Sequence, residues 1–249
     1  MKIAVCVSGQ LRGPWRDCIP TWAKMFKDNE EIDYFVHTWT NKTAPNAIAH
    51  ANKDSEEEEI NNQEINELKR LLKPKKILVE DPIEFETNQE WAVFDPNYHS
   101  QFYGVMMACH LKQQYEYEFA SQYDLCVRMR FDNFIQEDYK LTPVKMGHIN
   151  VIHQTFDTHY HQYRCSDVYW SASSFDYDRI CDFYSCIPKY KRSWFDAYIG
   201  LNPDHNPYGP EHVLSFHIKA NHIKPVQTYM PVKLKREEKH YSGGAHEIT

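Results

Sequence analysis

The chain has 249 residues, of which 42% are hydrophobic and 14% aromatic, and its formal net charge is −7. This length favours one domain, 1–249, over two small ones. Because the basic residues are scattered and outnumbered by acidic ones, the composition argues against a nucleic-acid partner. No apolar run is long enough to span a membrane, and the first residues lack a signal-peptide pattern, so we expect no transmembrane segment.

The cysteine pattern is that of a reduced protein. The seven cysteines include no Cys-x-x-Cys pair, and several lie inside apolar segments, as Cys6 and Cys126 do. Secreted disulfide scaffolds use paired cysteines at regular spacing. We therefore expect buried free thiols and a cytoplasmic location.

The first forty residues predict a strand–helix–strand unit. Lys2–Val7 is a short apolar run with β-branched residues, typical of a fully buried strand, and Ser8-Gly9 closes it. Pro14 suits the first turn of a helix, and the apolar residues after it recur at helical spacing. Asp33–Thr38 is predicted as the second strand. This unit is the building block of parallel sheets.

The same alternation continues along the chain. Residues 40–63 are polar and predict a solvated loop, and the polar tail from Lys233 is expected to be mobile until substrate binds. Strands are predicted at Lys76–Val79, Tyr123–Met129, Gly147–Ile152 and Asp167–Ser171, and helices at Ile60–Leu72, Ser100–Phe119, Phe175–Cys186 and Tyr208–Ala220. The fold class is therefore α/β, with a mainly parallel central sheet and helices on both faces.

Ligands of such sheets bind beyond the carboxyl ends of the strands. The first such place is the segment Ser8-Gly9-Gln10-Leu11-Arg12-Gly13-Pro14. Its glycines let the backbone approach a ligand and direct N–H groups at an anion, and Arg12 offers a bidentate contact to phosphate. The segment is neither a Walker loop nor a dinucleotide fingerprint, and a plain turn is an equally good interpretation.

The second place is His37-Thr38-Trp39, at the end of the second predicted strand. Trp39 is placed to stack on a base or a sugar, although a tryptophan here is also typical of a core. His37 is either a hydrogen-bonding partner of the ligand or a structural histidine.

The third place is the end of the strand at Tyr123–Met129, where Asp132 follows directly. A carboxylate at a strand tip suits Mn²⁺ or Mg²⁺, which need few protein ligands when substrate phosphates supply the rest. Arg128 and Arg130 alternate with apolar residues and so point to one face of the strand. They are predicted to contact a diphosphate or ribose, or else to form a salt bridge.

Three segments together resemble a set of small, stand-alone bacterial and viral glycosyltransferases of the GT-A type. Ile3–Arg12, Asp33–Trp39 and Asp124–Asp132 match the patterns SGQxR, DxFxHxW and YDxxxRxRxD, in the family's order. The likeness covers residues 1–135, the nucleotide-binding half, and is loose over 136–249, the acceptor side. It implies a Rossmann-like GT-A sandwich that binds a nucleotide-diphosphate sugar, often UDP-linked, together with Mn²⁺ or Mg²⁺.

The resemblance also implies roles for single residues. Ser8, Gly9 and Arg12 would meet the nucleotide or its diphosphate, and Asp132 would be the metal-binding member of an Asp-x-Asp element. The sequence departs from that element, because Arg130 stands at its first position. Either Arg130 partly replaces a cation, or a C-terminal histidine joins Asp132. The candidate histidines are His212, His217, His240 and His246.

Two acidic residues lie near places where the resembling proteins have one. Asp167 stands at the start of a predicted strand, and Glu211 opens a predicted helix. An inverting transfer needs a carboxylate to take the proton of the acceptor hydroxyl, and either residue could do this while the other holds sugar hydroxyls. A cap or turn role for Asp167 and a favourable helix-end charge for Glu211 remain open.

The expected function is transfer of a hexose, glucose by default, from a UDP-sugar to an unknown sugar, lipid or protein acceptor. One alternative is a metal-dependent hydrolase or nucleotidyltransferase centred on Asp157, His159 and His161, which would share one face of a strand. A further alternative is a non-catalytic module that binds nucleotide sugars.

Overall fold

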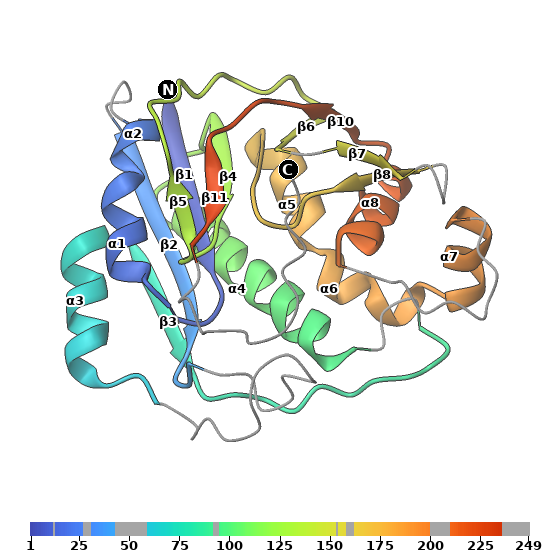
Figure 1. Cartoon of the computed structure of the whole chain (residues 1–249), viewed down its shortest axis with the longest axis horizontal. Coiled ribbons are helices and arrows are strands. Elements are labelled where there is room, and N and C mark those ends of the chain that lie inside the picture. The colour runs from blue at the N-terminus through green and yellow to red at the C-terminus, as the bar shows by residue number, and fades with distance from the viewer. Residues whose placement is uncertain are drawn as a thin grey trace, which may run out of the picture.

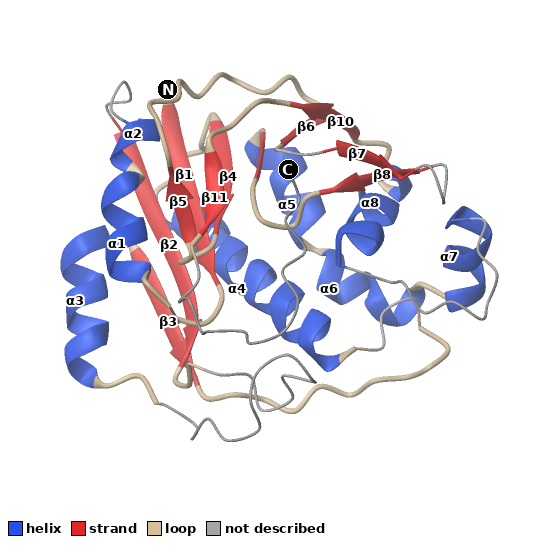
Figure 2. Cartoon of the chain, in the orientation of Figure 1, coloured by secondary structure: helices blue, strands red, loops and turns tan. Residues whose placement is uncertain are grey.

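The computed structural model of the chain describes residues 1–11, 13–26, 31–42, 59–91, 95–152, 154–157, 162–199 and 210–235. Figure 1 shows its layers and Figure 2 its helices and strands. The strands are β1 (Lys2–Ser8), β2 (Glu31–Trp39), β3 (Lys76–Glu80), β4 (Leu125–Met129), β5 (Asn133–Ile135), β6 (His148–Val151), β7 (Gln154–Asp157), β8 (Gln162–Cys165), β9 (Trp170–Ala172), β10 (Lys224–Gln227) and β11 (Val232–Leu234). The helices are α1 (Trp15–Thr21), α2 (Ala23–Phe26), α3 (Asn62–Leu72), α4 (Pro96–Glu118), α5 (Ser174–Cys181), α6 (Phe183–Cys186), α7 (Arg192–Ile199) and α8 (Pro210–Ala220), with a 3₁₀ turn η1 (Ile187–Lys189).

The central sheet has seven strands in the order β10-β6-β9-β4-β1-β2-β3. Strand β1 runs parallel to both β2 and β4, and β2 runs parallel to β3. Strand β9 is antiparallel to both of its neighbours, β4 and β6. The predicted α/β class and mainly parallel sheet are therefore confirmed, with one antiparallel strand inside the sheet.

Two hydrophobic cores cover the two faces of this sheet. Ile3, Val5 and Val7 of β1 point into the core beneath α1 and α3. Ala4 and Cys6 point into the core beneath α4 and α5, because successive side chains of a strand alternate between faces. Figure 1 shows α1 and α3 on one side of β1–β3 and α4 on the other. Helices on both faces are what a strand as apolar as β1 requires.

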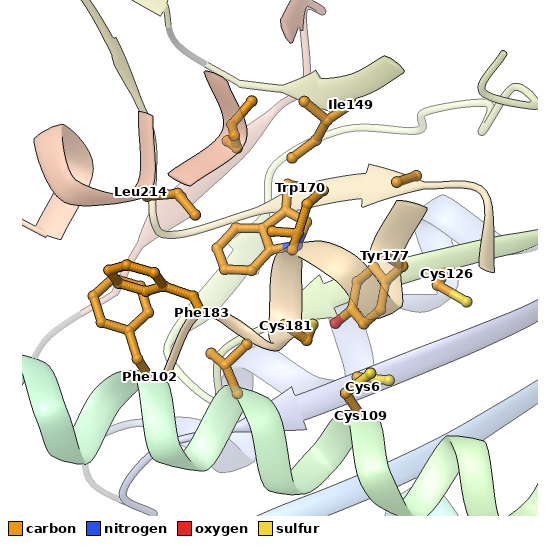
Figure 3. Close-up of a cluster of buried hydrophobic side chains, with 14 of the residues drawn as sticks. Cys6, Phe102, Cys109, Cys126, Ile149, Trp170, Tyr177, Cys181, Phe183 and Leu214 are labelled. Carbon is orange, nitrogen blue, oxygen red and sulfur yellow. The ribbon is translucent and has the colours of Figure 1, made fainter. Parts of the chain in front are cut away.

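The core beneath α4 and α5 is the more aromatic of the two. Figure 3 shows Phe102 of α4 against Phe183 of α6, with ring centroids 4.4 Å apart, and Trp170 of β9 above them. The buried cysteines Cys6 and Cys109 lie farther along the same core. All seven cysteines are free and six are buried, as their apolar surroundings in the sequence predict.

Local signals explain where the helices begin and end. Helix α3 begins at a capping box, in which Asn61 and Glu64 each accept a hydrogen bond from the other's backbone N–H. It ends at Lys73, whose φ of 45° is left-handed. Helix α4 begins at Pro96, earlier than the predicted start at Ser100, because the Asp95 carboxylate caps its first turn. Within the described part of the chain, no helix combines the length and apolar character that a membrane crossing requires.

Two expectations about strands are wrong. Asp167 does not start a strand: residues 166–169 form a turn, and β9 begins only at Trp170. Lys233 does not belong to a mobile tail, because it lies in β11, which pairs with β5. Strands β9 and β11 are each three residues long, and their positions depend on partners distant in the sequence rather than on local pattern.

Candidate functional site

The carboxyl ends of β1, β2 and β4 lie side by side. Ser8 is the register partner of His37, and Val7 is the partner of Met129, so Arg130 follows β4 at the same level. The three places that the sequence analysis named therefore follow neighbouring strands at one edge of the sheet. The chain leaves β1 toward β2 and β3 and returns on its other side as β4, so the strand order reverses between β1 and β4. Ligands of open α/β sheets bind at such a switch point.

The turn after β1 has a backbone that only glycine adopts readily. Ser8 is buried, and Gly9 follows with a φ of 132°. A Cβ at Gly9 would meet no atom within 4 Å, so the backbone here borders open space, and Gln10 is half-buried beside it. Arg12, the predicted phosphate ligand, lies outside the described residues.

Arg130 and Asp132 form a two-pronged ion pair just past β4. Nε of Arg130 donates to Oδ1 of Asp132 at 2.9 Å, and Nη2 donates to Oδ2 at 2.8 Å. Both oxygens of the carboxylate therefore face one guanidinium, in the geometry that arginine forms with carboxylates and phosphates alike. The salt bridge predicted as one interpretation of these residues is present.

Asp167 lies on the other side of the same guanidinium. Its Oδ2 accepts a hydrogen bond from Nε2 of Gln101 at 2.5 Å and lies 3.8 Å from Nη1 of Arg130. The turn that carries Asp167 is anchored from below, because Nη1 of Arg128 donates to the carbonyl oxygen of Val168 at 2.9 Å. Two segments far apart in the sequence thus place their carboxylates around Arg130.

Glu211, at the start of α8, belongs to the same electrostatic neighbourhood. Burial acts to lower the pKa of Arg130, but Asp132, Asp167 and Glu211 outweigh it and raise that pKa above its ordinary value. Burial also raises the pKa of Tyr98 on α4, and Glu211 and Asp167 add to the shift. Asp167, one of the two predicted catalytic carboxylates, therefore lies beside a cation that the sequence also singled out, and Glu211 is near enough to add to the pKa of that cation.

Arg128 points into the protein. Its side chain is buried and lies over the ring of Trp170, 4.7 Å from the centroid, and its Nε has no hydrogen-bond partner. Burial lowers the pKa of Arg128 to about 10, against the opposing charge of Asp167. The position supports the turn at Asp167, and the predicted contact of Arg128 with a nucleotide sugar stays a prediction.

His37 and Trp39 lie inside an aromatic cluster at the end of β2. Nε2 of His37 is 2.8 Å from Oε2 of Glu80, and burial lowers the histidine pKa against the pull of that carboxylate. Trp39 is buried and stacks on Tyr103 of α4, with centroids 5.5 Å apart. Phe85 lies edge-on to both Trp39 and Tyr103. This arrangement matches the structural interpretations of His37 and Trp39, and their contact with a ligand stays a prediction.

The predicted metal site at Asp132 offers carboxylate oxygens, but these oxygens already bind Arg130. Carboxylate oxygens are what Mn²⁺ and Mg²⁺ prefer, but both oxygens of Asp132 are turned to Arg130. No group of three or more His, Cys, Asp or Glu side chains in the described ranges is placed to hold a metal ion. The arrangement around Asp132 therefore does not fit a divalent ion while Arg130 stays in place.

Of the histidines predicted to join Asp132, the two that lie in the described residues are both buried in α8. The ring of His217 is engaged on both sides, by the Tyr190 hydroxyl at 2.7 Å and the Arg179 carbonyl oxygen at 2.9 Å. His212 is buried in α8. His240 and His246 lie outside the described residues. So do His159 and His161 of the alternative metal site, whose Asp157 is described only as backbone in β7.

Gln101 and Tyr98 are site residues that the sequence analysis missed. They stand three positions apart on α4, and residues at this spacing lie on one face of a helix. Gln101 precedes the buried Phe102 and is followed four positions later by the buried Val105. A polar residue among the buried apolar positions of a predicted helix is the signal that could have identified Gln101.

We compared the chain with known protein families and with curated proteins, and neither comparison finds a match.

Proposed function

We propose that this protein is a nucleotide-sugar-dependent glycosyltransferase that moves a hexose from a UDP-sugar to an unknown sugar, lipid or protein acceptor. One observation carries the proposal: Arg130 lies between Asp132 and Asp167, which come from separate segments, at the carboxyl edge of the sheet. Glu211 adds to the raised pKa of that guanidinium. Arg130 and the two aspartates stand beside the point where the strand order reverses. A cation between carboxylates suits a reaction that releases a diphosphate and a proton.

The proposed chemistry assigns one role to the cation and one to a carboxylate. The acceptor oxygen forms a bond to the anomeric carbon, while the bond between that carbon and the β-phosphate oxygen breaks and its electron pair leaves with UDP. The guanidinium of Arg130 stabilises the negative charge that develops on the diphosphate. Asp167 or Glu211 takes the proton of the acceptor hydroxyl, as an inverting transfer requires, and the other holds sugar hydroxyls.

The nucleotide is proposed to lie over the turn after β1. At Gly9 the backbone borders open space, next to Gln10 and the buried Ser8. The spacing from this turn to Arg130 is set by the pairing of β1 with β4. The GT-A variant of the fold and the contribution of Mn²⁺ or Mg²⁺ are part of the proposal. So is a cytoplasmic location, which free cysteines favour.

A thermal-shift screen tests the proposal directly. Nucleoside diphosphates and sugar nucleotides are added with and without Mn²⁺, and the unfolding temperature is measured. A ligand at about 1 mM with a micromolar Kd adds roughly 4 kcal/mol to the free energy of unfolding, which is easily detected. UDP and UDP-glucose are expected to stabilise the protein. Arg130→Met, which removes the guanidinium assigned to the diphosphate, is expected to weaken that stabilisation more than Lys76→Met, which removes a cation paired with Glu118 at the surface.

Each result has a definite meaning. If no nucleotide raises the unfolding temperature under any condition, the proposed function is wrong. If UDP-sugars bind but no UDP is released with Mn²⁺ and a range of acceptors, the chain is a non-catalytic binding module instead. Stabilisation by Zn²⁺ alone, lost in His159→Ala, would favour the hydrolase alternative.

A further inference from the structure

Strand β3 lies at one end of the central sheet and pairs on one side only, with β2 (Figure 1). The carbonyl oxygen of Glu80 accepts a hydrogen bond from the N–H of Thr40, which directly follows β2. Because the backbone groups of a strand alternate between its two edges, Glu80 and every second residue before it face β2. The N–H and C=O groups of Ile77 and Val79 therefore point away from the sheet. Within the described part of the chain, no backbone hydrogen bond occupies them on that side.

The other end of the sheet has the protection that edge strands usually carry. Its last strand, β10, begins at Lys224 and contains Pro225, which has no N–H to offer a further strand. Strand β3 has the sequence Lys-Ile-Leu-Val-Glu, with no proline inside it. Pro74 and Pro82 stand just outside β3, one before it and one after it, and restrict any further pairing to the stretch between them. β3 is therefore an open edge of defined length.

The order of side chains makes β3 complementary to itself in an antiparallel pair. A pair with Leu78 on its two-fold axis places Ile77 opposite the partner's Val79. The outward N–H and C=O groups of these two residues then bond across the axis, in both halves of the pair. The same register places Lys76 opposite the partner's Glu80, at a position without cross-strand hydrogen bonds, where facing side chains come closest. Opposite charges therefore meet twice, once at each end of the pair.

Shifted registers lose this match. If Ile77 stands on the axis, Glu80 lies opposite the partner's Pro74, which cannot take part in the hydrogen-bond ladder. A shift in the other direction sets Lys76 against the partner's Pro82. Either shift leaves the strand's charges without a partner of opposite sign. The sequence of β3 thus favours one register, the one centred on Leu78.

Exposed apolar side chains stand at both ends of this edge. The end of α4 lies beside the start of β3, because Nζ of Lys76 is 2.6 Å from Oε1 of Glu118. The next residue, Phe119, is 61% exposed, and Ile83, just past the end of β3, is 43% exposed. An antiparallel pair sets the start of one strand beside the end of the other. It therefore brings Phe119 of one copy and Ile83 of the other toward the same end of the interface, where both can leave water.

We propose that two copies of this chain associate through β3, in an antiparallel pair centred on Leu78, so that their central sheets join into one. The partner is a second copy because the charges of this edge match the edge itself. The other end of the sheet is protected by Pro225, so the assembly closes at the dimer and does not grow into a filament. The inference does not depend on the proposed function, and different measurements test the two.

The first experiment follows association of the full-length chain by sedimentation velocity at increasing protein concentration. Wild type is expected to pass from monomer to dimer. Lys76→Glu sets like charges against each other at both ends of the pair and is expected to weaken the dimer at least about tenfold. Glu80→Lys does the same with the opposite sign. An equimolar mixture of these two variants is expected to regain the dimer, because each facing pair then joins opposite charges.

Lys75→Glu is the matched control for the change in net charge. Lys75 precedes β3, and its ammonium pairs with Asp33 of the same chain, 3.3 Å away. This variant is expected to associate as wild type does. A wild-type protein that stays monomeric at every concentration overturns the proposal. So does a dimer that Lys76→Glu leaves as strong as Lys75→Glu does, because its interface then lies elsewhere.

The second experiment tests the register by cross-linking and does not need the variant of Glu80, which also holds His37. Leu78→Cys places two thiols opposite each other on the axis, about 4.5 Å apart at Cα, which suits a disulfide. The oxidant diamide is expected to link this variant into a dimer on a non-reducing gel. Val79→Cys is the control, because its two copies lie about 7–8 Å apart on the diagonal and are too far apart to link.

Wild type treated with diamide shows whether the native cysteines link by themselves, six of which are buried. A dimer band in Leu78→Cys that is absent from Val79→Cys and from wild type supports the register centred on Leu78. Equal linking of the two variants, or no linking of Leu78→Cys at concentrations where the protein sediments as a dimer, overturns it.

Discussion

Gly104 of α4 approaches His37 of β2 so closely that even a methyl group would fit between them only if the histidine ring shifted. A Cβ placed on Gly104 would lie 3.1 Å from Nδ1 of His37 and 3.7 Å from Cβ of Ser8. The His37 ring is buried and held by Glu80 on its other side. The helix therefore rests directly on the ends of β1 and β2, beneath the candidate site.

Gly104→Ala is expected to destabilise the protein by about 1–2 kcal/mol, measured as the free energy of unfolding in urea. Alanine in a helix interior ordinarily stabilises by up to about 1 kcal/mol relative to glycine, but here the new methyl group meets a buried ring that Glu80 holds in place. Ala108→Gly, at another buried position of α4, is a control in which only helix propensity and a small packing loss act. A stabilised Gly104→Ala protein would show that His37 yields easily.

Lys112→Met is expected to cost about 3–5 kcal/mol of unfolding free energy. The Lys112 ammonium is fully buried and lies 2.8 Å from Glu116 and 2.7 Å from Asp178, so its removal leaves two carboxylates without their cation. Lys76→Met is the matched control, because Lys76 pairs with Glu118 in water and its loss costs under about 1 kcal/mol. Urea unfolding followed by circular dichroism compares them, and equal losses would contradict the role of burial.

His217 is expected to make the fold sensitive to acid. Burial lowers its pKa from 6.5 to about 4, so the folded protein keeps the ring neutral where the unfolded chain protonates it. The resulting stability is fully present above pH 6.5 and is lost as the pH falls toward 4, by about 3 kcal/mol at the lower end. Urea unfolding at several pH values measures this slope.

Two variants show whether the pH dependence of the unfolding free energy comes from His217 itself or from its neighbours. His217→Phe is expected to flatten the dependence on pH between 6.5 and 4, because the group that titrates is gone. Tyr190→Phe removes the hydroxyl that contacts Nδ1 but keeps the buried ring, so its slope is expected to survive. A slope that persists in His217→Phe would assign the acid sensitivity to other groups.

Asp167→Asn and Glu211→Gln are expected to differ in steady-state kinetics of UDP release. Loss of the proton acceptor lowers kcat by about 10²–10⁴-fold with little change in the donor KM. Loss of the carboxylate that holds sugar hydroxyls raises KM more than it lowers kcat. Glu67→Gln on α3 serves as a control with wild-type kinetics. Unchanged kcat and KM in both site variants would exclude these carboxylates from the reaction.

The long elements were predictable from the sequence because their signals are local. The apolar run Lys2–Val7 is buried on both faces, and such a run predicts an interior strand without reference to the rest of the chain. The start of α4 was also readable, since Asp95-Pro96 is a strong helix-start signal that outweighs the apolar spacing beginning near Ser100. Giving weight to Asp95 as the N-cap would have predicted that α4 begins at Pro96.

The short elements and the second half of the site were harder to predict. β5 and β11 are separated by almost a hundred residues, and neither has an alternation that predicts pairing. Asp167 was singled out by family likeness rather than by pattern, so neither its place in a loop nor its approach to Arg130 was predicted. Gln101 escaped notice because its partner lies in a turn 66 positions away.

The pairing of β11 with β5 has a practical consequence for handling the protein. The backbone N–H of Lys235 donates to the carbonyl oxygen of Asp132 at 2.9 Å, so the described chain leaves the fold beside the candidate site. Met1 precedes β1 at the opposite edge of the sheet, a strand length of about 20 Å away. An affinity tag or fluorescent label attached ahead of Met1 therefore begins well clear of the candidate site, whereas the described chain ends at Lys235 beside that site.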